Sequence, residues 1–240
     1  MRIYGINPVV EALRADRVTA LRVSARADDR LAEILKLAER SGIPVRRANA
    51  HELERFAQGG VHQGVVADVK DQEHIGVEDL IVGASGAPLI VVLDGIEDPH
   101  NVGAILRTVD AAGGDGVVRQ SRHAARLDGA AAKASAGAVS HVKIAEVVNI
   151  ARALESLKDA GVWTVGFAGD AGKRYDEIDF TLPTAIVLGA EGTGLRRLVR
   201  ERCDWLVSVP MRGHVQSLNV SVTAGIALFE ALRQRNSHRP

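Results

Sequence analysis

The sequence is poor in several features that mark particular classes of protein. It has one cysteine, Cys203, among 240 residues, so no disulfide can form within the chain and no cysteine-based zinc site is available. Two Trp, two Tyr and four Phe are too few for the repeated stacking platforms of single-strand-binding modules. No apolar run approaches the roughly 18 residues of a membrane span. These absences favour a cytoplasmic chain that has no internal disulfide and does not span a membrane.

Net charge is also absent, because thirty Lys and Arg balance thirty Asp and Glu. A formal charge of zero excludes an indiscriminate, histone-like binder of polyanions. The first eight residues show no apolar stretch followed by a small-residue cleavage site, so we expect no export. The basic residues are mostly Arg, which is the better bidentate ligand for phosphate. Any contact with nucleic acid should therefore be local.

The pattern along the chain is that of an α/β protein, in which short β-branched runs alternate with amphipathic stretches. Strands are predicted at 20–23, 45–47, 65–69, 89–93, 116–118, 162–165 and 185–188. Helices are predicted at 9–13, 31–41, 101–112, 128–137, 149–160, 194–202 and 218–235. The proportion of β-branched residues falls over residues 73–87. We therefore expect a small domain at 1–72, a linker at 73–87 and a larger domain at 88–240.

The first unusual strand-to-helix junction follows the predicted strand 89–93. Such junctions matter because open parallel sheets bind ligands at the carboxyl ends of their strands. Here the chain reads Asn101-x-Gly103-x-x-x-Arg107, and helical spacing places Arg107 roughly opposite the apolar face. From these residues alone, Asn101 could equally cap the helix and Arg107 could be a solvated surface residue.

The second junction is Gly189-Ala190-Glu191-Gly192, at the end of a buried strand. Its glycines let backbone approach a ligand closely, with one carboxylate beside it. A simple glycine-rich turn with an acid near a helix N-terminus is the alternative. No G-x-G-x-x-G follows a strand and no P-loop is present, which disfavours dinucleotide binding and nucleotide hydrolysis.

The third junction joins Val209-Pro210-Met211 to Ser217-Leu218-Asn219-Val220-Ser221 and leads into the terminal helix. Backbone N–H groups are free at the start of a helix and can meet a ligand, although Ser217 could simply cap it. No serine lies in a G-x-S-x-G elbow and the histidines are scattered. A hydrolase triad is therefore not supported.

Together, the three junctions resemble the three motifs of the SpoU/TrmH branch of the SPOUT RNA methyltransferases. The run from Tyr4 to Leu13 and His62-Gln63-Gly64-Val65 resemble the amino-terminal domain of those members that methylate guanosine 2′-hydroxyls in 23S rRNA. The resemblance implies a carboxyl-terminal, trefoil-knotted SPOUT methyltransferase domain with a parallel sheet. It also implies a preceding small α/β domain of the ribosomal-protein L30e-like type that binds RNA, and a homodimer through the knotted domain.

The family implies S-adenosyl-L-methionine as cofactor and no metal. The resemblance assigns catalytic roles to Asn101, Arg107, Glu191, Ser217 and Asn219. It assigns cofactor contacts to Thr164, Gly166, Ala168, Gly189, Val209, Met211 and Leu218. A permanently charged guanidinium suits Arg107 to stabilise a developing alkoxide. Its very high pKa disfavours a role as the base, so we expect a phosphate or water to take the proton, and Glu191 to pair with Arg107 or a substrate donor.

Two groups of arginines could hold the RNA. Arg119, Arg122 and Arg126 follow a predicted strand, and Arg196 and Arg197 lie on a short predicted helix. Such clusters are often solvated faces, but beside a ribose site they become candidate phosphate contacts.

Two other functions remain open at this point: 2′-O-methylation of tRNA or another rRNA site, and a catalytically silent RNA-binding or ribosome-assembly factor. The amino-terminal domain favours large-subunit rRNA over tRNA, because the simplest tRNA members lack it. The complete polar set disfavours the silent factor, since binding alone would not require all of these side chains.

Overall fold

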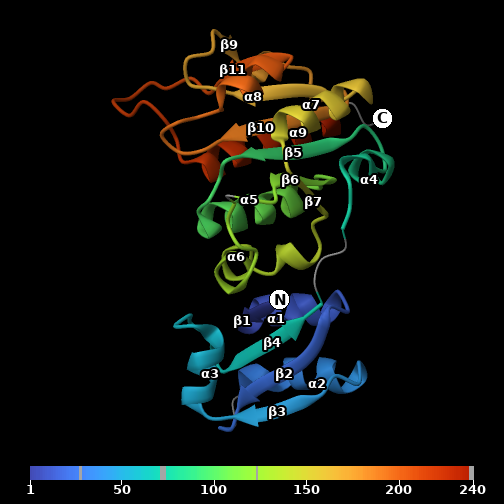
Figure 1. Cartoon of the computed structure of the whole chain (residues 1–240), viewed down its shortest axis with the longest axis vertical. Coiled ribbons are helices and arrows are strands. Elements are labelled where there is room, and N and C mark those ends of the chain that lie inside the picture. The colour runs from blue at the N-terminus through green and yellow to red at the C-terminus, as the bar shows by residue number, and fades with distance from the viewer. Residues whose placement is uncertain (27–28, 71–73, 123, 238–240) are drawn as a thin grey trace. The chain divides into compact units, whose positions relative to one another are not determined.

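The computed structural model describes residues 1–26, 29–70, 74–122 and 124–237, which contain two sheets (Figure 1). The chain divides into two compact units. The first comprises Met1–Glu73, Pro99–Arg107 and Arg126–His141, and the second comprises His74–Asp98, Thr108–Ala125 and Val142–Pro240. In the described part of the chain, no helix is long and apolar enough to cross a membrane.

The sheet of the first unit has the order β1-β4-β2-β3. Its strands are β1 (Arg2–Tyr4), β2 (Val18–Ser24), β3 (Val45–Ala48) and β4 (Val65–Val69). β4 runs antiparallel to β1 and β2, and β2 is parallel to β3. Its helices are α1 (Ile6–Arg14), the 3-10 turn η1 (Asp29–Leu31), α2 (Ala32–Arg40) and α3 (Ala50–Ala57).

Helix α3 covers part of one face of this sheet. Its Leu53 and Ala57 pack on Ala48 of β3 and Val66 of β4. The helix starts where it does because Asn49 forms a reciprocal cap with Glu52: the Asn49 side chain accepts from the Glu52 N–H at 2.9 Å, and the Glu52 carboxylate accepts from the Asn49 N–H at 3.0 Å. Such a box satisfies two otherwise free donors.

Residues from later in the chain complete the first unit. They form α6 (Gly129–Ala134) and the 3-10 turn η2 (Ala138–Ser140). Gly129 lies against Tyr4, where a Cβ would come within 1.9 Å of the ring. Only glycine fits this approach without displacement. Burial and the nearby Asp128 carboxylate raise the pKa of Tyr4.

The second unit is built on a parallel seven-stranded sheet of order β7-β6-β5-β10-β8-β11-β9. The strands are β5 (Leu89–Asp94), β6 (Gly116–Gln120), β7 (Ile144–Val147), β8 (Trp163–Phe167), β9 (Lys173–Arg174), β10 (Thr184–Gly189) and β11 (Trp205–Ser208). All six residues of β5 are buried. A strand covered on both faces reads as a continuous apolar run, which is why the sequence revealed it.

The helices of the second unit cover its sheet. They are α4 (Val77–Val82), the last five residues of α5 (Pro99–Ala112), α7 (Ile150–Asp159), the 3-10 turn η3 (Tyr175–Glu177), α8 (Arg197–Arg202) and α9 (Val220–Ser237). Leu80 of α4, Leu154 of α7 and Val199 of α8 join one core with Val92 and Val187 of the sheet. α9 packs against β10.

Several predicted element bounds were wrong. The expected linker 73–87 contains α4, whose Val77 and Leu80 are buried in the core. The terminal helix begins at Val220 and not at 218, because the Asn219 side chain caps it by accepting from the Ser221 N–H at 2.8 Å. Helix α8 begins at Arg197, three residues later than expected. Strands β1, β7 and β9 and helices α3 and α4 were not predicted, and β11 was expected only as the strand before the third junction, without bounds.

Candidate functional site

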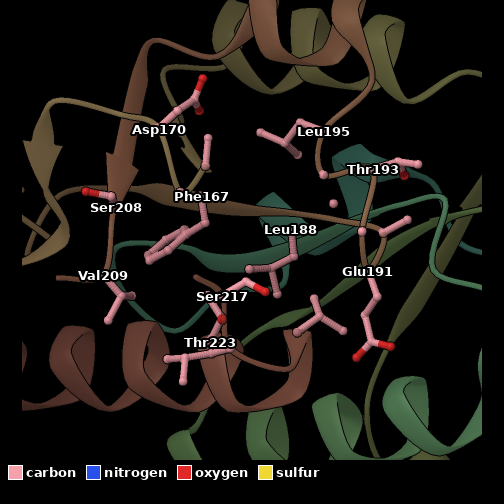
Figure 2. A pocket seen from close by; sticks show the side chains of 18 of the residues that line it. Phe167, Asp170, Leu188, Glu191, Thr193, Leu195, Ser208, Val209, Ser217 and Thr223 are labelled. Atoms are coloured by element: carbon pink, nitrogen blue, oxygen red, sulfur yellow. The ribbon is translucent and has the colours of Figure 1, made fainter. Parts of the chain in front are cut away.

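A cavity of about 670 Å³ opens at the carboxyl ends of β8, β10 and β11 in the second unit (Figure 2). Small-molecule sites commonly enclose roughly 300–1,000 Å³. Its walls come from four stretches of chain and two helices: Phe167–Asp170, Leu188–Leu195, Val207–Val209 with Met211, and Gln216–Val220, together with Arg200 of α8 and Thr223 of α9. The second and third predicted junctions therefore meet at one cavity.

Five of the predicted cofactor residues line this cavity: Ala168, Gly189, Val209, Met211 and Leu218. Thr164 and Gly166 are not among its lining residues. The Thr164 hydroxyl donates to Asp204 at 2.7 Å, and Gly166 faces the Cys203 sulfur. Successive strand residues point to opposite faces of the sheet, so Thr164 and Gly166 lie on the face of β8 opposite to that of Phe167, which lines the cavity.

Phe167 is the β8 side chain that reaches the cavity, with Asp170 in the turn after it (Figure 2). Sequence reasoning missed Asp170 and Thr223, did not single out Phe167 between the predicted Gly166 and Ala168, and did not place Arg200 at the cofactor. Asp170 follows the glycine just after β8, the same strand-end signal that identified the second junction. Arg200 belongs to an arginine-rich helix that the sequence shows, but no local signal places it at this cavity, because it lies 30 residues after its partner Asp170.

Three predicted catalytic residues, Glu191, Ser217 and Asn219, also line the cavity. The Asn219 amide donates to the Glu191 carboxylate at 2.6 Å. This bond joins the loop after β10 to the residue that caps α9. Glu191 was expected to pair with Arg107 or a substrate donor; its partner in the structure is Asn219.

The other two predicted catalytic residues lie on α5, within the first unit. The helix starts at Pro99, a residue well suited to a first helical position, so Asn101 lies in the first turn and is not its N-cap. Asn101 is buried and Arg107 is exposed. Because the Arg107 side chain is exposed, packing against the core does not hold its guanidinium in place.

The base of the loop after β10 is held by Asp94, the last residue of β5. The Asp94 carboxylate is fully buried and accepts from the Arg196 backbone N–H at 2.8 Å and from its Nε at 2.6 Å. Asp94 is also the register partner of Gly189, where the loop begins. Residues 190–195 therefore leave the sheet beside Asp94 and return to it.

Glycines make the narrow base of this loop possible. A Cβ on Gly189 would lie 2.2 Å from the carbonyl carbon of Gly194. Gly192 and Gly194 have φ of +79° and +67°, in the left-handed region that favours glycine. The Gly194 N–H donates to the Ala190 carbonyl at 2.9 Å, which closes the turn. The glycine-rich sequence is thus required by the loop's own geometry.

Asp94→Asn is expected to raise the Kd for S-adenosylmethionine about tenfold, with less effect on RNA affinity. Hydrogen bonds to charged groups contribute about 1.5–3 kcal/mol each, and 1.4 kcal/mol corresponds to tenfold in affinity. The neutral amide weakens the contacts with Arg196 that close the loop. Isothermal titration with the cofactor measures the change, and Asp110→Asn on the exposed side of α5 is the control. Unchanged cofactor affinity would contradict this role.

The charge of the cavity fits a sulfonium cofactor. Asp170 and Glu191 supply two carboxylates and Arg200 one guanidinium among its lining residues, which complements the net positive charge of S-adenosylmethionine. Arg200 holds Asp170 through bonds of 2.8 and 3.0 Å, and these bonds lower the pKa of Asp170. Phe167, Leu188 and Val209 provide apolar surface. Among the described residues, no cluster of three or more His, Cys, Asp or Glu could hold a metal ion.

The predicted RNA-binding arginines differ in availability. Arg119 is buried, donates to the Ala125 carbonyl at 2.5 Å and lies 3.5 Å from Glu146. Burial lowers the pKa of Arg119 against the opposing effect of Glu146. The expectation that Arg119 meets a phosphate is therefore not met in this conformation. Arg196 is engaged by Asp94.

Three of the predicted arginines are exposed and, unlike the exposed Arg196, are not held by a buried carboxylate. Arg122 is exposed, Arg126 pairs with Asp128 at 3.0 Å, and Arg197 pairs with Glu201 at 2.9 Å. Pairs at the surface are weak, so these guanidiniums can exchange partners for phosphate.

Cys203 is expected to resist alkylation at pH 8 in the folded chain. Burial raises the pKa of its thiol to about 12, and the thiol also donates to the Val199 carbonyl at 3.3 Å. Because the thiolate is the reactive form, its population at pH 8 falls about a thousandfold relative to a free cysteine. The rate of iodoacetamide labelling, followed by mass spectrometry with and without denaturant, measures this. Equal rates in both conditions would contradict it.

Family models and known proteins agree with this geometry. Residues 88–229 match the SpoU rRNA Methylase family, and residues 2–74 match RNA 2'-O ribose methyltransferase substrate binding. The chain is 44% identical to the 23S rRNA (guanosine-2'-O-)-methyltransferase RlmB of Pseudomonas syringae pv. tomato, over 99% of this chain and 97% of that protein.

Solved structures of this group are similar as well. The SpoU methyltransferase AviRb of Streptomyces viridochromogenes, in complex with AdoMet, superposes with a TM-score of 0.83 at 26% identity, over 99% of this chain and 91% of that one. The TrmH/SpoU tRNA modifying enzyme of A. aeolicus matches 67% of this chain and 81% of its own, with a TM-score of 0.55 at 28% identity. A family model that covers residues 88–229 and a relative that matches nearly the whole chain leave one assignment: this chain belongs to the SpoU rRNA methylase family.

Proposed function

We propose that this protein transfers the methyl group of S-adenosylmethionine to the 2′-hydroxyl of a guanosine in 23S rRNA. The observation that carries the proposal is the cavity at which the Gly189–Gly192 and Val209–Asn219 segments meet. The near full-length similarity to a 23S rRNA guanosine methyltransferase supports the choice of nucleotide. The match to a substrate-binding model over residues 2–74 supports an RNA substrate that contacts the amino-terminal domain as well as the catalytic domain.

The chemistry follows from the groups present. Bound S-adenosylmethionine supplies a methyl group already activated by its sulfonium. The ribose oxygen forms the new bond to this methyl carbon as the carbon–sulfur bond breaks, and the hydroxyl proton leaves to water or a phosphate. The protein must align the two reactants and favour loss of that proton. Arg107 stabilises the developing alkoxide, since a charged donor placed where charge develops is the most effective catalyst of such a step.

The remaining predicted catalytic residues have supporting roles. Asn101 and Ser217 orient the ribose hydroxyl and its neighbours. Glu191 and Asn219, joined at 2.6 Å, hold the loop after β10 against the start of α9. Ala168, Gly189, Val209, Met211 and Leu218, which line the cavity, contact the cofactor. Arg122, Arg126 and Arg197 meet RNA phosphates.

We also propose the wider organisation that the family implies. Residues 1–72 act as the RNA-binding domain and residues 88–240, together with the preceding α4, carry catalysis. The chain after β11 passes through a loop to form a trefoil knot; the bond from Asn219 back to Glu191 and the packing of α9 on β10 support this path. Val222 and Phe229, half-exposed on α9, support a homodimer through this domain. The protein acts in the cytoplasm, where rRNA is made.

A methylation assay on different RNAs tests the proposed function against its alternatives. Purified protein is incubated with labelled S-adenosylmethionine and, separately, with 23S rRNA from a methylation-deficient strain, with tRNA and with 16S rRNA. Label in 23S rRNA alone is expected. Label in tRNA would move the substrate, and no label in any RNA, despite cofactor binding, would favour an RNA-binding or assembly factor. The short match of the tRNA modifying enzyme favours the first outcome.

A further inference from the structure

An arginine patch lies at and beside Phe56 of α3, which packs on the sheet of the first unit. It consists of Arg2, Arg22, Arg46 and Arg55, and we call it the Phe56 patch. The guanidinium carbons of Arg22, Arg2 and Arg55 lie 4.3, 4.7 and 5.4 Å from the centre of the Phe56 ring. A single cation–π contact needs one cation near the ring, whereas three guanidiniums lie around the ring of Phe56. None of these residues belongs to the motifs that define the methyltransferase site.

Sheet register adds the fourth arginine. Arg22 of β2 is the direct partner of Arg46 on β3, so both side chains lie on one face of the sheet. Like charges directly opposite each other are destabilising. Arg46 is exposed, and within the described residues neither a hydrogen bond nor an ion pair joins it to another side chain. The fold thus tolerates an unfavourable pair of cations at this position.

One carboxylate, Asp68, balances part of this charge. It pairs with Arg2 at 2.9 Å and with Arg22. Burial raises the pKa of Asp68, but the hydrogen bonds from Arg22 and Arg2 outweigh it and hold the pKa below its ordinary value. Four cations and one anion leave a local charge of +3. A structural role, holding α3 on the sheet, accounts for Arg2 and Arg22 but not for the exposed Arg46 and Arg55.

We propose that the Phe56 patch binds the phosphate backbone of the substrate RNA, with Arg46 and Arg55 as its direct contacts. Guanidinium is suited to phosphate by its planar, bidentate geometry, and a local patch of this kind is the electrostatic footprint of a nucleic-acid site. Asp68 and the Phe56 ring hold Arg2 and Arg22 behind these two contacts. The proposal rests on the proposed function for the identity of the RNA, and it assigns a surface that the methyl-transfer site does not include.

The test compares two double variants of the full chain with equal change of charge. Arg46→Glu/Arg55→Glu alters the patch, and Lys36→Glu/Arg40→Glu alters two exposed cations on α2. Affinity for undermethylated 23S rRNA is measured by filter binding between 50 and 200 mM salt. We expect the patch variant to bind more than tenfold more weakly at the lowest salt, with a salt slope smaller by about two, since each phosphate contact contributes about one. The α2 variant should lose less than threefold.

The design separates folding, RNA binding and catalysis. Arg46→Glu places an acid opposite Arg22, so the variant should keep or raise its melting temperature. Cofactor affinity, measured by titration calorimetry, should equal that of the wild type. Equal RNA affinity for the two double variants would overturn the proposal. A failed methylation assay with patch-dependent RNA binding would instead contradict the proposed function and leave the patch as an RNA site.

Discussion

Arg107→Ala is expected to lower kcat for methyl transfer about 10²–10³-fold, the typical cost of removing one group that stabilises a developing oxyanion. The affinity for S-adenosylmethionine should not change, because Arg107 is not among the residues that line the cofactor cavity. The fold should persist as well, since Arg107 is exposed on α5 and alanine is the best helix former. Single-turnover kinetics at saturating RNA and cofactor measure the effect.

Two further variants sharpen this result. Arg107→Lys keeps the charge but loses the planar fork, so it should retain part of the activity if charge is the main contribution. Arg152→Ala removes another exposed arginine, on α7, and should keep the wild-type rate. Turnover by Arg107→Ala within twofold of the wild type would remove Arg107 from the mechanism.

Gly189→Ala is expected to weaken cofactor binding by one to two orders of magnitude. The added Cβ would lie 2.2 Å from the carbonyl carbon of Gly194 and 2.4 Å from its oxygen. These are backbone atoms, so the loop that forms one wall of the cavity must move. Forcing an extra methyl group into a packed site costs about 1–3 kcal/mol, and each 1.4 kcal/mol is tenfold in affinity.

The matched control is Gly172→Ala, because no atom lies within 4 Å of a Cβ at that position. Titration calorimetry with S-adenosylmethionine should give a Kd for Gly172→Ala within twofold of the wild type. A Gly189→Ala protein with wild-type cofactor affinity would show that the narrow base of this loop does not matter for binding.

The parts of the fold that sequence could predict are those with strong local patterns. The β5 segment is a continuous apolar run because both of its faces are buried, and the three junctions carry unusual residues at strand ends. Strand β1, by contrast, has three residues, too few to show an alternation. Helix α4 has six residues, and its Val77 and Leu80 become significant only when they meet the core of the second unit.

The site shows the same division between local and distant causes. The loop residues Gly189 and Glu191 could be found from their glycine-rich setting at a strand end. The engagement of Arg196 by Asp94, 102 residues earlier, could not, and neither could the burial of Arg119, which depends on Glu146 and the Ala125 carbonyl. Charged side chains look alike in a sequence, and only tertiary contacts decide which of them are free for a ligand.

The central claim is that a guanosine 2′-oxygen of 23S rRNA receives the methyl group. The most direct measurement is nucleoside mass spectrometry of undermethylated 23S rRNA after incubation with S-adenosylmethionine and either the wild type or Arg107→Ala. We predict a single new 2′-O-methylguanosine with the wild-type protein and none above background with Arg107→Ala. A methyl group on a base, or on the ribose of another nucleoside, would contradict the account.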